Sequence, residues 1–504
     1  MAIIGYDFSA DERIPLKHET NRSDLKIAII GGGMAGILSA IKLRRNGYNN
    51  FTIYEKAKRL GGTWRENTYP GIACDVPSHS YCYEFEPNPE WSHTCSPGAE
   101  ILEYFENVAV KYGVTKHVQF EAEISQLRFE DDKWHLQCKD GQSGVFDFIV
   151  AATGVLHHPA YPDIPGLQTF TGPTFHSARW DHTVKLEGQR VGIIGTGSSA
   201  IQIIGDLSGK VAKLIQFQRT PQWILPRPNP TYSEQEKQYF RENPEAMQKI
   251  RAEQMQMFEH GFSSAVVGEN PQALADIQAA TLAHLENKVS DSVLREKLRP
   301  NYQAACKRLI MDDKYYDAIQ HPDSELVTET ISAIEPAGVR TADGKLHELD
   351  VLVIATGFKA DQFLRPIEVI GRNGKTLEEA WADRPSAYLS VCAPDFPNLV
   401  MLNGPNGPVG NFSLIDVADI QLDFFMKLLD ELQAGDYTAF APKSEAAERF
   451  EAERVQATKN TVWVSGCKSW YLDDNGVPAA WPWSMHRFRT ALGNPDFADF
   501  ELTR

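Results

Sequence analysis

The chain of 504 residues is long for a single hydrophobic core and predicts more than one domain. Its 42% hydrophobic and 23% charged residues are typical of a folded globular protein and exclude a disordered or fibrous chain. The net charge of −17 argues against nucleic-acid binding, which needs clustered positive charge, and no apolar run is long enough for a membrane span.

The first residues and the cysteines favour a cytoplasmic protein. Residues 1–24 lack the apolar centre of a signal peptide and form an N-terminal extension in this interpretation. None of the seven cysteines belongs to a CxxC pair, so a reducing setting is the simplest interpretation. We also expect no metal site.

The first pattern with chemical meaning is LKIAIIGGGMAGILSAIKLRRNGYNNFTIYEK, residues 25–56. An apolar strand leads into a G-x-G-x-x-G turn at Gly31, Gly33 and Gly36, a helical pattern follows, and a second strand ends at Glu55. The glycines allow a tight turn and close approach to a pyrophosphate, and Glu55 can accept hydrogen bonds from a ribose. The start of the helix, which includes Ala35, favours phosphate. This order predicts a dinucleotide site, and a glycine-rich turn without a ligand is the alternative.

A broken stretch, TFTGPTFHSARWDH, occupies residues 169–182. Gly172 and Pro173 interrupt it, so we expect no regular element there. We interpret the stretch as a connector that acts as a hinge, in which His176 ties it to one domain and Trp180 packs on the other.

A second dinucleotide pattern follows in QRVGIIGTGSSAIQIIGDL, residues 189–207. Gly195, Gly197 and Ala200 form the G-x-G-x-x-A variant. The next strand ends in Arg219 and Thr220 instead of an acid, and an arginine there suits a 2′-phosphate. This predicts an NADP site, with a solvated surface charge as the alternative for Arg219. The other turn residues expected to bind the cofactor are Thr196, Ser198 and Ser199.

Glu55 follows the first turn and Arg219 follows the second. This order of an acid and then a base predicts an FAD site in the first unit and an NADPH site in the second. Two further apolar strands, within residues 146–154 and 349–358, both end in Ala-Thr-Gly and frame the second pattern. We therefore predict an α/β protein with two Rossmann-like domains, the second inserted into the first. The predicted parts are an FAD-binding domain at 25–157, an inserted NADP-binding domain at 158–350, and the rest of the FAD-binding domain with substrate-side loops at 351–504.

The inserted part contains a nearly glycine-free region, residues 231–300, with a helical pattern. It opens on Ser233-x-x-Glu236, which is typical of a capping box. We predict a helical subdomain that serves as a lid or packing element without chemistry of its own.

Several segments resemble the Baeyer–Villiger monooxygenases. The connector carries that family's F-x-G-x-x-x-H-x-x-x-W-[P/D] fingerprint from Phe170 to Asp181. GGTWRENTYPGIACD, residues 61–75, matches its [A/G]-G-x-W-x-x-x-x-[F/Y]-P-[G/M]-x-x-x-D in full. The Lys307–Arg308 pair in ACKRLIMDDKYYDAI falls at the family's Lys-Arg pair. NGPNGP at 403–408 and GCKSWYLDDNGVPAAWPW at 466–483 resemble its substrate-side segments.

This resemblance implies an enzyme that uses FAD, NADPH and O2 to convert a ketone to an ester or lactone through a flavin C4a-peroxide, with sulfides as a further substrate class. Arg308, a permanently charged donor, would stabilise the peroxide and polarise the ketone, while Asp75 holds it in place. Lys307 would reach the 2′-phosphate, and Trp470 would cover the nicotinamide. The remaining residues that we expect at the cofactors are Gly62, Thr63, Trp64, Asp75, Tyr81 and Ile124.

Other interpretations remain open at this stage. Asp75 and Arg308 could form an ordinary structural ion pair, and Trp64 could be core packing. A flavin monooxygenase that oxygenates nitrogen or sulfur shares both folds, but the Trp180-Asp181 ending and Arg308 argue against it. A disulfide reductase needs a redox cysteine pair, and none has a suitable spacing. A non-oxygenating flavin reductase or a non-catalytic flavin sensor would not need Arg308 and Asp75 together. Monomer and homodimer fit equally well.

Overall fold

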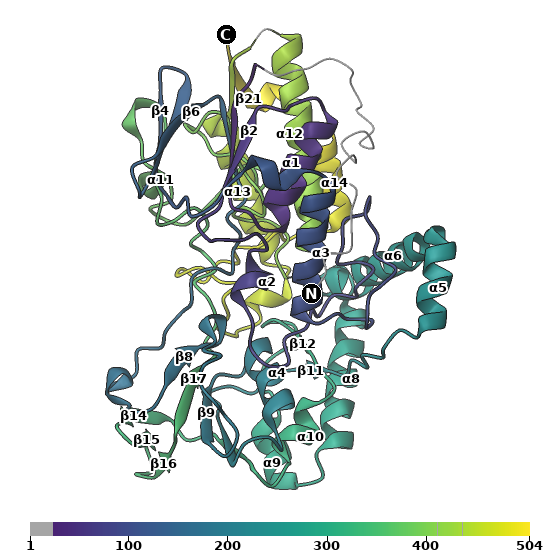
Figure 1. The fold of residues 1–504 in the computed structure, drawn as a ribbon, viewed down its shortest axis with the longest axis vertical. Coiled ribbons are helices and arrows are strands. Elements are labelled where there is room, and N and C mark those ends of the chain that lie inside the picture. The colour runs from purple at the N-terminus through teal and green to yellow at the C-terminus, as the bar shows by residue number, and fades with distance from the viewer. Residues whose placement is uncertain (1–23, 411, 436) are drawn as a thin grey trace.

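The computed structural model describes residues 24–410, 412–435 and 437–504, which form an elongated molecule of two lobes (Figure 1). The predicted N-terminal extension lies outside these residues except for Asp24. Figure 1 shows both the early and the late parts of the chain in the upper lobe, and the middle of the chain in the lower lobe. Among the described helices, none combines the length and the apolar character that crossing a membrane requires.

The first lobe is built on a five-stranded parallel sheet. Its strands in spatial order are β19 (Leu399–Met401), β7 (Phe148–Ala151), β1 (Ile27–Ile30), β2 (Phe51–Tyr54) and β3 (Val118–Gln119). All four residues of β1 are buried, as expected for a central parallel strand that is covered on both faces.

The second lobe repeats this arrangement with a second five-stranded parallel sheet. Its strands in spatial order are β13 (Ser324–Val327), β10 (Lys213–Phe217), β9 (Arg190–Ile194), β17 (Val351–Ile354) and β8 (Thr174–His176). In both sheets the strand that precedes a glycine turn, β1 or β9, occupies the centre. The predicted α/β fold with two Rossmann-like units is therefore confirmed.

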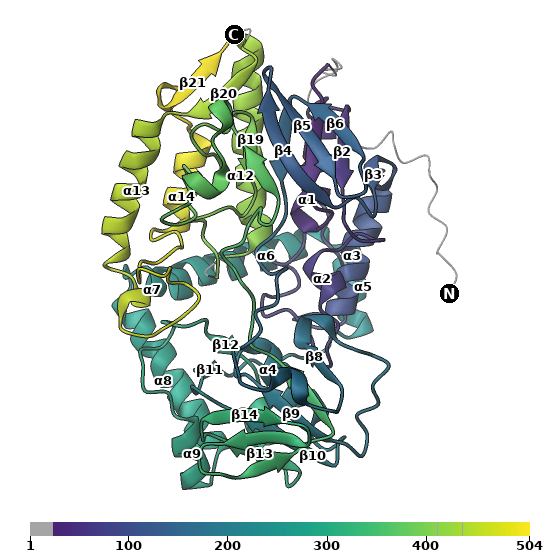
Figure 2. The same ribbon diagram turned by 90° about the vertical axis from the view of Figure 1, so that its left-hand side faces the viewer.

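Helices cover both sheets (Figures 1 and 2). Those of the first lobe are α1 (Met34–Arg45), α2 (Thr63–Glu66), α3 (Gly98–Lys111), α11 (Leu377–Ala380), α12 (Leu414–Ala434), α13 (Ser444–Thr458) and α14 (Met485–Gly493). The middle of the chain contributes α4 (Ser198–Leu207), α5 (Glu234–Glu242), α6 (Pro244–Phe258), α7 (Ser264–Val266), α8 (Pro271–Lys288), α9 (Ser292–Leu298) and α10 (Tyr315–Ile319). Their apolar faces, for example Ile37 and Ile41 of α1, enter the core of each lobe.

Four smaller sheets, built from short strands, accompany the two main sheets in the described part of the chain. One small sheet holds β4 (Ile124–Glu130), β5 (Lys133–Cys138), β6 (Ser143–Phe146) and β18 (Glu368–Ile370), and another holds β14 (Ile331–Glu335), β15 (Gly338–Thr341) and β16 (Leu346–Glu348). Two strand pairs complete the list: β11 (Ile224–Leu225) with β12 (Ile310–Met311), and β20 (Ala439–Pro442) with β21 (Phe500–Thr503).

The predicted helical region contains α5 to α9, and its capping box is confirmed. The Ser233 side chain accepts a hydrogen bond from the backbone of Glu236, whose carboxylate accepts one from the backbone of Ser233. This helical subdomain also docks on the first lobe. Arg251 of α6 donates to the carbonyl oxygens of Ser80 and Cys82, and it forms an ion pair with Asp416 of α12.

The predicted boundary at residue 351 needs a correction, because β17 belongs to the second sheet. It pairs in parallel with β9 and with β8, so the chain returns to the first lobe only after this strand. The two segments that cross between the lobes run side by side, with hydrogen bonds from Ala160 to Gly357 and from Lys359 to His158. The sequence prediction failed here because an apolar strand ending in Ala-Thr-Gly occupies the same place in either sheet.

The connector also contains a regular element, contrary to expectation. Residues Thr174–His176 form β8, the edge strand of the second sheet. An edge strand tolerates the interruption at Gly172 and Pro173, because one side of the strand needs no partner.

A disulfide bond that the sequence did not predict joins Cys306 to Cys467. The two cysteines are 161 residues apart, so their pairing depends on the tertiary fold. The other five cysteines are free and buried, and Cys74, the neighbour of Asp75, belongs to the core of the first lobe.

Candidate cofactor and active site

The first glycine turn lies between β1 and α1. A Cβ atom on Gly36 would lie 1.9 Å from the carbonyl oxygen of Gly31, so the helix can approach the strand only with glycine at this position. A Cβ on Gly33 would lie 3.5 Å from the Cα of Gly62. The GGTW segment therefore lies backbone to backbone against the first turn, and Ala35 is buried behind it in α1.

Glu55 follows β2 and is buried beneath this turn. Its carboxylate accepts hydrogen bonds from the backbone N–H groups of Gly32, at 2.8 Å, and Ala57, at 2.8 Å. It also forms an ion pair of 3.1 Å with Arg65. The acid thus stands beside the glycine turn, as the motif predicts. The backbone N–H of Ala122 donates to the carbonyl oxygen of Glu55, and this bond brings the segment that contains Ile124 close to the first turn.

The segment of residues 61–75 extends from the first glycine turn to the second lobe. At its start, the indole N–H of Trp64 donates to the hydroxyl of Tyr81 at 3.2 Å, and Thr63 opens α2 between them and the turn. Further on, the hydroxyl of Tyr69 donates to the side chain of Gln202 in α4 at 3.0 Å. One short segment therefore contacts both nucleotide folds.

Asp75, at the end of this segment, forms an ion pair with Arg308. A guanidinium N–H of Arg308 donates to the carboxylate at 2.5 Å, although the two residues are 233 positions apart. Burial alone would raise the pKa of Asp75, but the charge and hydrogen bond of Arg308 outweigh it and lower that pKa. The Asp75 charge in turn raises the pKa of Arg308. Both groups stay ionised, and their side chains remain 24% and 37% exposed, so a bound molecule can reach them.

Two residues that the sequence analysis missed complete this cluster. Arg227 adds a second positive charge that helps to lower the pKa of Asp75, and it also contacts Cys95. Tyr471 also contacts Arg308: burial raises the pKa of Tyr471, and the charge of the guanidinium and its hydrogen bond oppose the rise. The SWY sequence motif contains this tyrosine, whereas no pattern marks Arg227.

The second glycine turn follows β9. A Cβ on Gly197 would meet nothing within 4 Å, so the space in front of the turn is open. Ser198 and Ser199 begin α4, and Ala200 is fully buried against the sheet. The hydroxyl of Thr196 donates to the carbonyl of Thr220 at 3.0 Å. This bond links the turn to the segment after β10.

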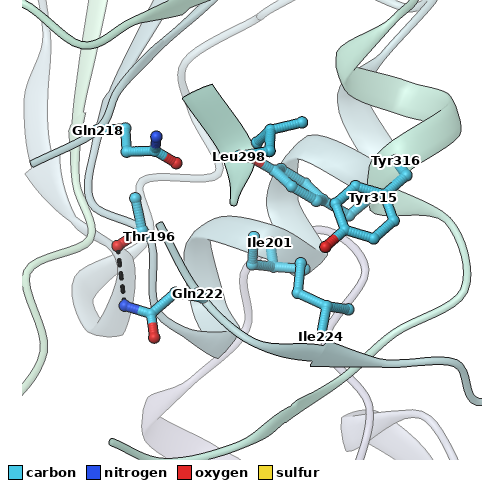
Figure 3. A pocket seen from close by; sticks show the side chains of 8 residues that line it. All are labelled: Thr196, Ile201, Gln218, Gln222, Ile224, Leu298, Tyr315 and Tyr316. Carbon is cyan, nitrogen blue, oxygen red and sulfur yellow. Dashed lines mark hydrogen bonds between the residues drawn. The ribbon is translucent and has the colours of Figure 1, made fainter. Parts of the chain in front are cut away.

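A small hollow lies beside this turn (Figure 3). Its lining residues are Thr196, Ile201, Gln218, Gln222, Ile224, Leu298, Tyr315 and Tyr316. It has almost no free volume, so we assign no ligand to it. Its polar side chains nevertheless connect the turn to its surroundings, because Gln222 donates to the hydroxyl of Thr196 at 3.1 Å.

Two cations stand together beside the second fold. Arg219 follows β10 and is exposed. Burial lowers the pKa of Lys307, and the charge of Arg219 lowers it further, so the two cations are near enough to interact. The ammonium group of Lys307 lies 5.0 Å from the centre of the Tyr302 ring. Arg219, Thr220 and Lys307, which the sequence analysis assigned to the 2′-phosphate of NADP, therefore lie in the same region of the structure.

The connector contacts both lobes and the segments that cross between them. His176 is fully buried next to the crossing segments, with its ring 5.4 Å from Tyr161 and 5.9 Å from Phe358. Trp180 packs on Phe175, with ring centres 4.9 Å apart, and on the core of the second lobe. Two other connector residues contact the first lobe: Arg179 forms an ion pair with Glu66 at 2.7 Å, and the His182 ring forms a hydrogen bond with the hydroxyl of Thr68.

Trp470 lies at the edge of the Arg308 cluster. Its side chain is 41% exposed and stacks on Tyr471, with ring centres 4.2 Å apart. The Cys306–Cys467 disulfide joins this loop to the segment that carries Lys307 and Arg308. The predicted residues therefore gather in three places: the first turn, the second turn, and the ion pair between them.

Comparisons with known proteins agree with this arrangement. The family described as Flavin-binding monooxygenase-like matches residues 24–367. An uncharacterised monooxygenase of Mycobacterium tuberculosis is 42% identical over 478 residues, which cover 95% of this chain and 96% of that protein. A Baeyer–Villiger monooxygenase of Streptomyces coelicolor is 37% identical and is covered to 94%, with 97% of this chain aligned. The crystal structure of OTEMO with FAD and NADP superposes with a TM-score of 0.86 at 26% identity, over 95% of this chain and 99% of that one. The chain therefore belongs to the flavin-binding monooxygenase-like family, and its sequence and fold are similar to those of Baeyer–Villiger monooxygenases.

Proposed function

We propose that this protein binds FAD at the first glycine turn and NADPH at the second, and that it uses them with O2 to convert ketones to esters or lactones. The observation that carries the proposal is the Asp75–Arg308 ion pair between the two nucleotide folds. The name of the Streptomyces relative, a Baeyer–Villiger monooxygenase, supports the proposed reaction, and the OTEMO complex with FAD and NADP supports the two cofactors.

The first site fits FAD. The backbones of Gly33 and Gly62 face each other with no side chain between them, and a pyrophosphate can approach the N-terminus of α1 at this point. Glu55 lies where the ribose of an adenosine is bound in such folds. Bound FAD supplies the hydride acceptor and the centre that reacts with O2.

The second site fits NADPH. The open space in front of Gly197 leaves room for a pyrophosphate at the N-terminus of α4. Arg219 and Lys307 form a pair of positive charges beside it, and such a pair suits a 2′-phosphate. An NAD-specific site would instead carry an acid at the end of β10.

Arg308 is the residue that adapts this pair of sites to ketone oxygenation. Its guanidinium stays charged at any relevant pH and presents a planar fork of donors to negative charge on oxygen. Such charge develops when a ketone carbonyl is attacked. Asp75 holds the guanidinium in one orientation, and the interaction is stronger than a neutral hydrogen bond because both partners are ionised. This pairing of a fixed cation with two dinucleotide sites distinguishes the proposed enzyme from a simple flavin reductase.

Product analysis tests the proposal. The purified holoenzyme is incubated with NADPH and O2 and with a panel of linear, cyclic and aryl ketones, a thioether and a tertiary amine. We expect esters or lactones that carry one oxygen atom from ¹⁸O2. Sulfoxides or N-oxides without any ester would instead favour the heteroatom-oxygenating alternative. Consumption of NADPH with no oxygenated product from any member of the panel would contradict both.

A further inference from the structure

Tyr302 contacts both Lys307 and the segment that follows Arg219, the two cations of the second site. The Lys307 ammonium lies over its ring at 5.0 Å, a distance at which the ring attracts a cation. Burial lowers the pKa of Lys307, and the positive charge of Arg219 lowers it further, so the two cations repel each other. The attraction to the Tyr302 ring therefore offsets part of this repulsion and helps to keep the Lys307 ammonium in place.

The hydroxyl of Tyr302 fixes the segment that follows Arg219 and Thr220. It lies 3.0 Å from the carbonyl oxygen of Pro221 and 3.0 Å from the side-chain oxygen of Gln222, and it donates its proton to these acceptors. Burial raises the pKa of Tyr302, so the hydroxyl keeps this proton. The indole N–H of Trp223 donates to the carbonyl of Tyr302 at 2.8 Å and fixes the tyrosine backbone in return.

The network continues from Gln222 into the second glycine turn. The amide nitrogen of Gln222 donates to the hydroxyl of Thr196, as the dashed line in Figure 3 shows, and Thr196 donates to the carbonyl of Thr220. Thr196 lies between Gly195 and Gly197. An unbroken series of contacts thus extends from the Lys307 ammonium, through Tyr302 and Gln222, to the turn that faces the pyrophosphate.

We propose that Tyr302 is a positioning residue for NADP(H), with separate tasks for its two parts. The ring holds Lys307 beside Arg219 and thereby serves the 2′-phosphate. The hydroxyl holds the 220–222 segment and, through Gln222, the glycine turn. That turn faces the pyrophosphate, which NAD and NADP have in common. The inference rests on the proposed function, because it assigns NADP(H) to this site.

Two substitutions separate the two tasks. Tyr302→Phe keeps the ring and removes the hydroxyl, whereas Tyr302→Leu removes both. Binding of NADP+ and of NAD+ to the oxidised, FAD-loaded protein is measured by isothermal titration calorimetry. We expect Tyr302→Phe to raise both dissociation constants by a similar factor, about threefold, with the preference for NADP+ unchanged. We expect Tyr302→Leu to reduce that preference by about fivefold, because Lys307 loses its platform.

Matched controls keep the test decisive. Tyr232 is also half-buried among aromatic rings but lies in the helical subdomain's junction with the first lobe, and Tyr232→Leu should leave the preference unchanged. Gln222→Ala should reproduce the uniform weakening of Tyr302→Phe. If Tyr302→Leu fails to retain FAD, comparison of Tyr302→Phe with Gln222→Ala still decides the hydroxyl's part. Tyr302→Met, which also removes the ring, then decides the ring's part: it should reduce the preference for NADP+ in the parent background but not when Lys307→Met is already present.

The outcomes distinguish this inference from the proposed function. A parent protein that binds NAD+ as tightly as NADP+ would overturn the assignment of the second site itself. A parent protein that prefers NADP+, together with a Tyr302→Leu variant that keeps the full preference, would overturn only the role of Tyr302.

Discussion

His79 is a buried histidine whose charge state makes stability depend on pH. Its side chain is 2% exposed, and its ring lies 5.4 Å from that of Tyr232 and 4.8 Å from that of Phe240. Neither ring nitrogen has a hydrogen-bond partner within the described part of the chain. Burial lowers the pKa of His79 to about 4.

Acid should therefore destabilise the protein through His79. The unfolded chain, with a histidine pKa of about 6.5, binds the proton more readily than the folded protein does between that pH and about 4. The stability contributed by the neutral ring is thus complete above this window and falls as the pH decreases through it. We predict that His79→Phe stabilises the protein by about 2 kcal/mol more at pH 5 than at pH 7.5.

Thermal unfolding at the two pH values measures this difference. His486→Phe is the control, because His486 is exposed and should leave the pH dependence unchanged. An equal loss of melting temperature on acidification in His79→Phe and in the parent protein would contradict the prediction.

At the scale of elements, the first glycine turn and the GGTW segment form one unit. Gly33 and Gly62 face each other closely, so a side chain on Gly33 would enter the space that we assign to the pyrophosphate. We predict that Gly33→Asp abolishes FAD binding, because it adds both bulk and negative charge there. Flavin absorbance of the purified protein measures the bound fraction. Gly493→Asp is the matched control, since a Cβ there meets nothing within 4 Å. A Gly33→Asp protein that purifies with a full complement of FAD would refute this assignment.

The elements that the sequence predicted are those with a local pattern. Both strand–turn–helix units follow from glycine spacing beside apolar runs, and the capping box at Ser233 follows from a four-residue motif. The strand β8 was missed, because Gly172 and Pro173 suggest a break and only pairing with β17 makes a strand there. The place of β17 was also misjudged, since its pattern suits either sheet.

At the scale of the site, resemblance to a family predicted what local patterns could not. Asp75 and Arg308 are 233 residues apart, and no periodicity connects them; the family motifs alone suggested that they meet. Arg227 and Tyr302 were not predicted as parts of the site, because their roles arise from contacts between irregular segments.

For the whole molecule, the Cys306–Cys467 disulfide is a covalent link between the inserted and the C-terminal parts of the chain. Because it closes a loop of 161 residues, it restricts the unfolded chain strongly. We predict that Cys306→Ser combined with Cys467→Ser lowers stability by about 2–4 kcal/mol. Added dithiothreitol should lower the melting temperature of the parent protein but not that of the double variant.

Thiol titration checks the premise of this prediction. The parent protein, denatured without reductant, should show five reactive thiols out of its seven cysteines. Seven reactive thiols would show that the disulfide does not form under the conditions of purification, and the stability difference should then disappear.

At the scale of the whole molecule, we propose that the two nucleotide folds cooperate in oxygenation because the ion pair with Asp75 holds Arg308 between them. The most direct test compares ester formed, NADPH consumed and hydrogen peroxide released in the parent protein, Arg308→Ala, Arg308→Lys and Asp75→Ala. We predict tight coupling of NADPH to ester in the parent protein, and continued NADPH consumption with hydrogen peroxide but no ester in Arg308→Ala. Arg308→Lys should recover little, because an ammonium lacks the planar fork, and Asp75→Ala should lose coupling only in part. An Arg308→Ala protein that forms ester with the coupling of the parent would contradict the account.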